Sequence, residues 1–274
     1  MFKKFLSRLN KKKQKLGQPK KVTSTKQKIN TYNLIKKNSF NEKINLKIIT
    51  SHDKNYINIG QITTETMRNY AKKYNLRFEF LEMPVTNRVP TWNKIISIKE
   101  QILKKENDYI MWVDADVFFP KDAENILSTI EDNFEIYLTS HYSSVFKGSN
   151  FKNTILTTKR INCGVMIYKV SDFCVKFLND VWNKKEYLDH FWYEQAAIMD
   201  LIGLKADITG NLEDNKGDDT YLNKIKFLPK EWNTIPSFSE ISSESLRPSI
   251  IHLAGMEDKD RIDILNDYIK RGKI

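Results

Sequence analysis

Two repeating patterns of apolar and polar positions divide the chain from Ile44 onward. Short, nearly continuous apolar runs indicate β-strands that are buried on one or both faces. Apolar residues spaced three and four positions apart indicate amphipathic helices. The predicted strands are residues 46–50, 76–81, 109–113, 134–139, 163–169 and 249–252. The predicted helices are residues 59–74, 93–105, 122–131, 171–183, 190–202 and 258–271.

Strands alternate with helices over most of this region, and residues 207–250 are less regular. Such alternation is typical of an open α/β sheet, because parallel strands need long crossover connections that are usually helical. We therefore predict an α/β, Rossmann-like fold with a mostly parallel, twisted sheet and flanking helices. Ligands bind such sheets beyond the carboxyl ends of the strands, so candidate site residues are expected in the loops at that edge.

Residues 1–43 follow a different pattern, and we predict a separate basic arm ahead of a domain that spans residues 44–274. Residues 17–43 are polar and are typical of a linker. The first residues place four apolar side chains on one helical face, ahead of a lysine run: Phe2, Phe5, Leu6 and Leu9. Such a segment is typical of a weak anchor on anionic lipid, and the alternative is a disordered, soluble basic arm.

The net charge of +11 is unevenly distributed along the chain, and this distribution determines which partners it indicates. Residues 1–43 contain 14 Lys and Arg and a single acid, a net charge of +13. Residues 44–274 then carry 31 basic and 33 acidic residues, a net charge of −2. A nearly neutral domain does not indicate a basic cleft, so we predict no nucleic-acid partner.

Cysteine usage and hydropathy indicate the compartment. Cys163 and Cys174 form neither a zinc motif nor a disulfide framework, which favours a reducing environment. No apolar run approaches the roughly 20 residues of a membrane span. Lys3, Lys4 and Arg8 interrupt the first apolar residues, unlike in a signal peptide. We predict a cytoplasmic location, with or without peripheral membrane contact.

The strongest candidate for chemistry is the motif Asp114-Ala115-Asp116, directly after the apolar run at 109–113. The tripeptide alone means little, because the polar stretch Asp258-Lys259-Asp260 repeats it. Two carboxylates at a sheet edge repel one another unless a cation lies between them. Their oxygens suit Mg²⁺ or Mn²⁺, which bridge to diphosphate oxygens. The alternative is a pair of solvated turn acids that cap the helix predicted at 122–131.

Several further short motifs accompany this one in a particular order. The full set is Trp92-Asn93-Lys94, Trp112-Val113-Asp114-Ala115-Asp116, Asn162-Cys163-Gly164-Val165, Glu194-Gln195-Ala196-Ala197 and His252-Leu253-Ala254-Gly255. Their order and spacing resemble the galactosyl/mannosyl/xylosyltransferase family, which includes fungal mannan-building enzymes and plant xyloglucan xylosyltransferases. The resemblance extends over residues 44–258. It implies the GT-A fold of nucleotide-sugar-dependent glycosyltransferases, and it implies retention of configuration.

The resemblance implies that Asp114, Asp116 and His252 hold the metal, Mn²⁺ or Mg²⁺. His252 has some support of its own, since it ends an apolar run and precedes Ala254-Gly255, where backbone can approach a phosphate closely. A structural role is the alternative for a histidine at a strand end.

A nucleotide-sugar site is predicted around this metal. The loop formed by Thr50, Ser51 and His52 would receive the base and ribose, mostly because of its place in the topology. Lys94 would offset the charge of the leaving diphosphate, the alternative being an ordinary solvated lysine. The other predicted donor contacts are Asp114, Ala115, Asn162, Gly164, Gly255 and Lys259.

Two positions depart from the family's pattern. Two carboxylates usually precede its Gln, but here Tyr193 stands at the first position. Glu194 and Gln195 remain as predicted catalytic residues, with Glu194 orienting sugar hydroxyls or stabilising an oxocarbenium-like transition state. The family also tends to have a Lys two residues beyond the late Gly. Glu257 stands there, and Lys259 is the predicted substitute.

We therefore predict a metal-dependent glycosyltransferase that moves a hexose or pentose from a UDP- or GDP-sugar to a glycan or glycolipid hydroxyl. Two alternatives stay open. A sugar nucleotidyltransferase would share the sheet, but it should have a Gly-rich phosphate loop where this chain has Ser51-His52-Asp53-Lys54. A catalytically inactive binding protein or adaptor would keep the fold without the reaction.

Overall fold

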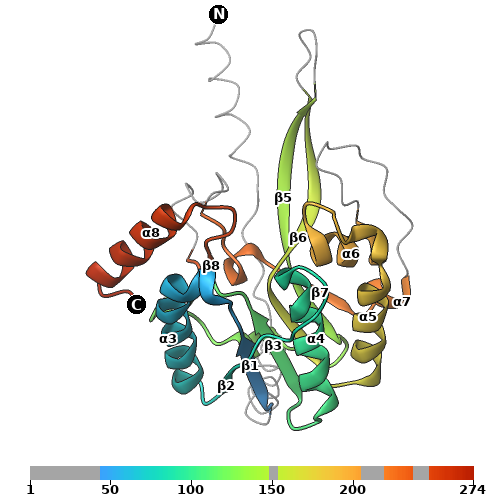
Figure 1. Ribbon diagram of the computed structural model, residues 1–274, viewed down its shortest axis with the longest axis horizontal. Helices are drawn as coiled ribbons and strands as arrows, with labels where there is room; N and C mark the ends of the chain where they lie inside the picture. The colour runs from blue at the N-terminus through green and yellow to red at the C-terminus, as the bar shows by residue number, and fades with distance from the viewer. Residues whose placement is uncertain (1–43, 148–153, 205–218, 237–246) are drawn as a thin grey trace, which may run out of the picture. The chain divides into compact units, whose positions relative to one another are not determined.

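A six-stranded sheet forms the centre of the described part of the chain (Figure 1). The structure is a computed structural model, and it describes residues 44–147, 154–204, 219–236 and 247–274. The basic arm predicted for residues 1–43 lies outside these ranges. In spatial order the strands are β2 (Arg77–Phe80), β1 (Leu46–Thr50), β3 (Tyr109–Val113), β6 (Thr154–Lys169), β5 (Ile136–Lys147) and β7 (Ile225–Leu228).

The strand directions make this sheet mixed but mostly parallel. β1 pairs in parallel with β2 and β3, and β5 pairs in parallel with β7. β6 runs antiparallel to both of its neighbours, β3 and β5. A second, antiparallel pair joins β4 (Val117–Phe118) to β8 (Ile251–His252). The predicted α/β sheet is therefore confirmed, with one reversed strand that the sequence pattern does not reveal.

Two apolar clusters attach the helices to these sheets. On one face of the large sheet, α4 (Pro90–Leu103), α5 (Asp172–Asn183) and α6 (Tyr193–Leu201) pack against alternate strand residues. Representative members of this cluster are Trp92, Ile98, Trp112, Met166, Phe177 and Ala197. Elsewhere α3 (Ile57–Lys73) and α8 (Asp258–Lys270) lie beside each other and enclose the small sheet (Figure 1). That second cluster contains Ile59, Phe118, Ile251, Leu253 and Leu265.

Most predicted elements end within a few residues of the observed ones, but the helix predicted at 122–131 is wrong. The structure has only a 3₁₀ turn there, Ile126–Thr129, capped by the side chain of Asn125. The hydroxyl of Tyr70 on α3 donates to the carbonyl of Glu124 (2.7 Å) and accepts from the amide of Ile126 (2.8 Å). These tertiary hydrogen bonds engage a carbonyl and an amide that an α-helix would pair with backbone groups four residues away.

The strands of the hairpin β5–β6 are longer than predicted, and they contain an irregularity that matters for the site. Leu138 pairs with Met166, whereas the next residue, Thr139, pairs with Asn162. Residues 163–165 therefore have no partner in β5, and they form a bulge in β6. Bulges of this kind redirect side chains near functional sites. β4, β7 and the short α7 (Asp219–Leu222) are elements that the apolar pattern misses.

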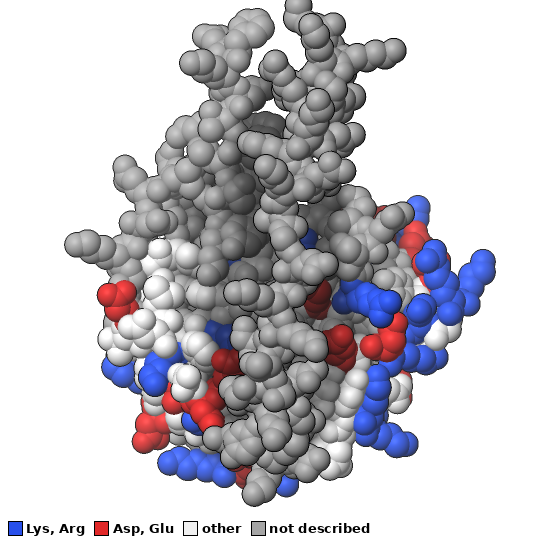
Figure 2. Space-filling view, turned by 180° about the vertical axis from the view of Figure 1, so that it is seen from behind, with Lys and Arg blue, Asp and Glu red and all other residues white. Residues whose placement is uncertain are grey.

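Surface charge on the described residues is mixed. On the face shown in Figure 2, basic and acidic side chains are interspersed, which agrees with the small net charge of residues 44–274. Residues 44–274 cluster as one compact unit. Among the described residues, no helix is both long and apolar enough to cross a membrane.

Candidate functional site

A cavity of about 390 Å³ opens at the carboxyl ends of β1 and β3. Loops from six parts of the described chain line it: those after β1 and β3, the β6 bulge, the starts of α4 and α6, and the segment from β8 into α8. This is the edge at which α/β sheets bind ligands. The lining includes Ser51, His52, Lys94, Asp114, Ala115, Asp116, Asn162, Gly164, Glu194, Gln195, His252 and Gly255.

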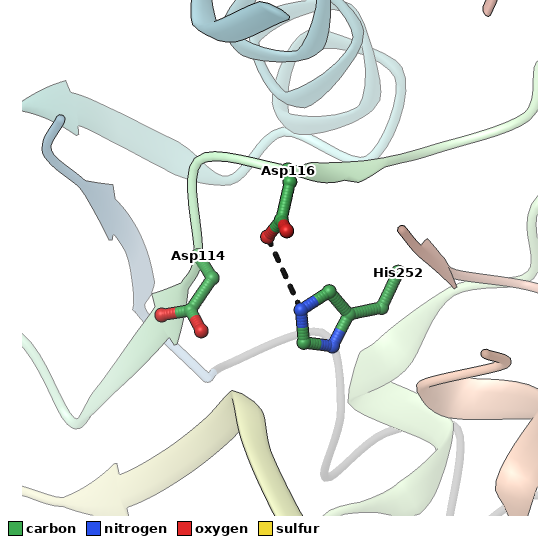
Figure 3. Close-up of side chains that lie close together, drawn as sticks. All are labelled: Asp114, Asp116 and His252. Atoms are coloured by element: carbon green, nitrogen blue, oxygen red, sulfur yellow. Dashed lines mark ion pairs between the residues drawn. The ribbon is translucent and has the colours of Figure 1, made fainter. Parts of the chain in front are cut away.

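The structure brings Asp114, Asp116 and His252 together, with one potential ligand atom from each within 4.8 Å of the others. Figure 3 shows the Asp116 carboxylate pointing at the imidazole of His252, with the Asp114 carboxylate lying beside this pair. His252 Nε2 lies 3.1 Å from Asp116 Oδ1. Two carboxylates and one imidazole are donors that suit Mn²⁺ or Mg²⁺, so the residues present fit the predicted metal.

Pairing between β4 and β8 places His252 beside the two aspartates. Val117 is opposite His252 in the ladder, and the amide of Leu253 donates to the carbonyl of Asp116 at 3.0 Å. Close packing then fixes the ring: a Cβ atom added to Gly164 would lie 2.2 Å from Cε1 of His252. A glycine is therefore needed at position 164 because the imidazole occupies the space that a side chain would fill. The predicted reason was a contact with the sugar.

Asp116 is held by two cationic or potentially cationic neighbours. Its Oδ2 atom lies 3.3 Å from Nη2 of Arg261, which also donates from Nε to the carbonyl of Leu253 (3.1 Å). Burial alone would raise the pKa of Asp116, but His252 and Arg261 outweigh it and the pKa lies below its ordinary value. Asp116 is thus an anion in the protein. Arg261 is the functional candidate that the sequence analysis missed.

Asp114 faces a second cation, Lys94, on α4. The Lys94 ammonium lies 2.7 Å from Asp114 Oδ1 and 3.1 Å from Glu194 Oε1. The indole Nε1 of Trp112 also donates to Asp114 Oδ1, at 2.6 Å. Burial alone would lower the pKa of Lys94, but the two carboxylates outweigh it and raise the pKa above its ordinary value. Lys94 is a buried, charged residue and not the solvated lysine of the alternative interpretation.

Glu194 is a buried carboxylate with spare hydrogen-bonding capacity. Its side chain is 5% exposed, and its Oε2 atom has no hydrogen-bond partner among the described residues, whereas Oε1 faces Lys94. Burial raises the pKa of Glu194, Lys94 opposes that shift, and the pKa stays above its ordinary value. The neighbouring Gln195 accepts at Oε1 from the amide of Cys163 (3.1 Å), so its Nε2 group is left as a donor.

The predicted site residues fall into two groups. Most of them line the cavity. Thr50 and Lys259 are outside the lining: Thr50 is fully buried in β1, and Lys259 is exposed on the first turn of α8. The second Asp-x-Asp motif begins α8, where Asp258 pairs with Arg261 at 2.9 Å. Arg261 follows Asp258 by about one helical turn, which is a sequence signal for it, but the family pattern indicates a lysine in this region.

Comparison with solved structures places the fold among glycosyltransferases. The first match, a glycosyltransferase involved in the glycosylation of the major capsid of PBCV-1, has a TM-score of 0.57 and 16% identity, covering 81% of this chain and 99% of that chain. The bifunctional glycosyltransferase WbbM has a TM-score of 0.47 and 13% identity, covering 83% of this chain and 49% of that chain. Apo GlyE of Streptococcus pneumoniae TIGR4 has a TM-score of 0.46 and 10% identity, covering 84% of this chain and 64% of that chain.

No protein-family model matches the sequence, and no curated protein matches it significantly. The likeness to the PBCV-1 enzyme confirms the predicted GT-A type of α/β fold. At 16% identity it shows the fold alone, so the chemistry must be argued from the site.

Proposed function

We propose that the protein is a metal-dependent glycosyltransferase that transfers a hexose or pentose from a UDP- or GDP-sugar to a glycan or glycolipid hydroxyl. The observation that carries this proposal is the Asp114–Asp116–His252 cluster inside the cavity at the sheet's carboxyl edge. A metal cluster in that position of a glycosyltransferase-like fold suits the diphosphate of a nucleotide sugar. The protein's narrower membership of the galactosyl/mannosyl/xylosyltransferase family remains a prediction.

When bound, Mn²⁺ or Mg²⁺ supplies a Lewis acid that neutralises charge on the diphosphate. Asp114, Asp116 and His252 would hold it, each supplying one ligand atom. Lys94 pairs with Asp114, and Arg261 pairs with Asp116. We infer that these fixed cations stabilise the charge that develops as the sugar–phosphate bond breaks. Arg261 thus supplies a positive charge in the lining, and Lys259 remains a weaker candidate on the exposed turn.

Glu194 and Gln195 are proposed to contact the donor sugar. The unpartnered Oε2 of Glu194 would accept from a sugar hydroxyl, which satisfies a buried oxygen. The Nε2 group of Gln195 would donate to an oxygen near the anomeric carbon. A bond then forms between the acceptor oxygen and the anomeric carbon as the bond to the diphosphate breaks. The departing phosphate takes the acceptor's proton, and the resemblance implies that configuration is retained.

The test is hydrolysis of a panel of UDP- and GDP-sugars by the whole protein, with and without Mn²⁺. We expect slow, metal-dependent release of UDP or GDP from at least one donor. Asp116→Ala should abolish this release, since Asp116 is a proposed metal ligand, and Asp260→Ala in the second Asp-x-Asp motif should leave it unchanged. If no donor is hydrolysed and Asp116→Ala leaves nucleotide binding unchanged, the proposal is wrong.

The same assay separates the alternatives. A nucleotidyltransferase would release pyrophosphate from a nucleoside triphosphate and a sugar phosphate, and it would leave nucleotide sugars intact. An inactive binding protein would bind a nucleotide without turnover of any donor.

A further inference from the structure

A chain of hydrogen bonds runs from the backbone of β6 to the imidazole of His252. It begins at the bulge, where the amide N–H of Gly164 donates to the side-chain oxygen of Asn162 at 2.8 Å. A backbone N–H can only donate, so the Asn162 atom that faces it must be the oxygen and not the amide nitrogen. The backbone N–H of Gly164 therefore determines the orientation of the Asn162 side-chain amide, because this N–H can only donate.

The next link is Asn233, which lies between the 3₁₀ turn Lys230–Trp232 and β8 and is fully buried. Its Nδ2 atom lies 2.8 Å from Oδ1 of Asn162 and 3.3 Å from the Asn162 carbonyl oxygen. Both neighbours are acceptors, so this Asn233 atom must be the donor nitrogen. Its Oδ1 atom then faces Nδ1 of His252, at 3.1 Å.

The last link determines where His252 carries its proton. The amide oxygen of Asn233 can only accept, so Nδ1 of His252 must be protonated. A neutral imidazole with its proton on Nδ1 has its lone pair on Nε2. Nε2 is the atom that faces Asp116, at 3.1 Å, inside the candidate metal cluster. Without metal, a proton on Nε2 would donate to Asp116, and a bound metal would displace that proton and take Nε2 as its ligand atom.

Packing at the same bulge fixes the ring in place. The space beside Gly164 is filled by His252, because an added Cβ atom would lie 2.3 Å from Nδ1. Gly164 therefore both starts the hydrogen-bond chain and limits how far the imidazole can shift. Hydrogen-bonded partners of this kind are needed to orient metal-ligating histidines, and their loss typically weakens metal binding about 10–100-fold.

We propose that Asn233 is a positioning residue for the metal site, which acts with Asn162 to hold the imidazole of His252 with its Nδ1 donating to Asn233 and its Nε2 directed at Asp116 and the metal. This inference rests on the proposed metal-dependent function. Asn162 was predicted to contact the donor. Its side-chain oxygen instead accepts from Gly164 and Asn233, so we assign this oxygen to the hydrogen-bond chain that positions His252.

The tautomer can be measured without metal. Long-range ¹H–¹⁵N correlation spectra of ¹⁵N-histidine-labelled protein at pH 8 distinguish the two neutral tautomers by their nitrogen shifts. The chain has four histidines, and His252→Gln identifies the signals of His252. We expect wild-type His252 to be protonated at Nδ1, and Asn233→Leu to lose that preference. A wild-type His252 that has no proton on Nδ1 overturns the proposal, whereas a second proton on Nε2 agrees with it, because Asp116 accepts there when no metal is bound.

The effect on the metal is measured as Mn²⁺ affinity, by electron paramagnetic resonance of free Mn²⁺. Asn233→Leu should bind Mn²⁺ about 10–100-fold more weakly than wild type. Asn233→Asp should bind Mn²⁺ more weakly than wild type as well, because its second oxygen would face two acceptors of Asn162 and could not donate to either. Asn107→Leu is the matched control, since it changes another buried asparagine, one outside the cavity lining and ahead of β3.

The outcomes separate this inference from the metal site itself. If wild-type protein binds no Mn²⁺ but shows the Nδ1-protonated tautomer, the metal site is wrong and the positioning role of Asn233 stands for the imidazole alone. If Asn233→Leu is folded and binds Mn²⁺ as tightly as wild type, the positioning role is wrong and the metal site stands. Should Asn233→Leu fail to fold, the protonation of Nδ1 in the wild-type protein and the smaller Asn233→Ala variant decide the question.

Discussion

Lys94 is a buried cation that pairs with two carboxylates of the candidate site. It is 6% exposed and lies between the carboxylates of Asp114 and Glu194, so each member of the trio makes the burial of the others tolerable. The sequence motif around Trp92 marked Lys94 as a diphosphate contact. Its ion pairs, one with a residue 20 positions away and one on another helix, were not apparent.

Lys94→Met should unfold more easily and lose activity. Removing one partner of a buried ion pair costs about 3–5 kcal/mol, because it leaves unpaired charge behind. We expect that loss in urea unfolding at pH 8 and a fall in donor hydrolysis of about 100-fold. Lys99→Met, on the same helix, is the control, since Lys99 contacts only the amide oxygen of Asn179 in the described structure. A folded Lys94→Met protein with normal hydrolysis contradicts the assigned role.

The stability deficit of Lys94→Met should depend on pH through Glu194. Burial already raises the pKa of Glu194 above its ordinary value, and loss of Lys94 removes the main opposing influence. A carboxyl whose pKa is raised by folding favours the folded state at low pH, and this contribution is lost as pH rises. The deficit should therefore shrink between pH 8 and pH 5, and urea unfolding at both values measures it. A deficit that grows at pH 5 contradicts the sign.

Gly164→Ala tests the packing of the imidazole. The added methyl group would overlap the ring of His252, so we expect a destabilisation of about 1–3 kcal/mol from overpacking. His252→Ala removes the ring and should relieve this strain. A double-mutant cycle measured by urea unfolding checks the coupling, and purely additive effects would show that the two residues do not compete for the same space.

At the scale of elements, side-chain hydrogen bonds from α3 decide the structure that follows Asp116. Tyr70 satisfies two backbone groups there, and the hydroxyl of Tyr74 donates to the carbonyl of Ala123 at 2.5 Å. The apolar spacing of residues 122–131 predicted a helix because periodicity alone contains no information about a neighbouring helix. Only the packed structure shows which backbone groups are already engaged.

Tyr70→Phe should therefore destabilise the protein more than Tyr74→Phe. Tyr70 makes two hydrogen bonds to the backbone, and burial raises the pKa of its hydroxyl well above the ordinary value. Leaving buried backbone groups unsatisfied costs about 1–3 kcal/mol. Thermal or urea unfolding of both variants measures the difference. Donor hydrolysis should survive in each, because neither tyrosine lines the cavity. Equal stability of both variants and wild type contradicts this account.

At the scale of the whole molecule, the positive charge is concentrated in residues 1–43, and residues 44–274 are nearly neutral. The described residues within 44–274 contain the whole candidate site. Contact of residues 1–43 with an anionic membrane stays a prediction, as do the donor, the acceptor and the cytoplasmic location.

Deletion of residues 1–43 should separate catalysis from surface binding. We expect donor hydrolysis to continue, since every proposed site residue lies after residue 43. Binding to vesicles that contain phosphatidylserine should fall, and added salt should weaken the binding of the full-length protein, as expected of basic residues near anionic lipid. Sedimentation with vesicles measures both. Unchanged vesicle binding by the deletion variant would rule out the anchor and favour the soluble-arm interpretation.

The local pattern of residues was sufficient to predict the α/β class, most helices and strands, and the position of Asp114 and Asp116 after a buried strand. These are properties of short segments, because periodicity and the end of an apolar run depend only on neighbours in the chain. The end of an apolar run also gave some support to His252, whereas only the resemblance suggested Lys94 and a shared site.

Tertiary structure decided the rest. The reversed direction of β6, its bulge, and the β4–β8 ladder bring residues 162–164 beside His252, across a long stretch of chain. The same packing selects Arg261 for the cavity and leaves Lys259 outside it. Asn233 was missed because a buried asparagine has no periodic signature, and its role depends on partners 71 and 19 residues away. Contacts of that kind exist only once the chain has folded, so no local pattern contains them.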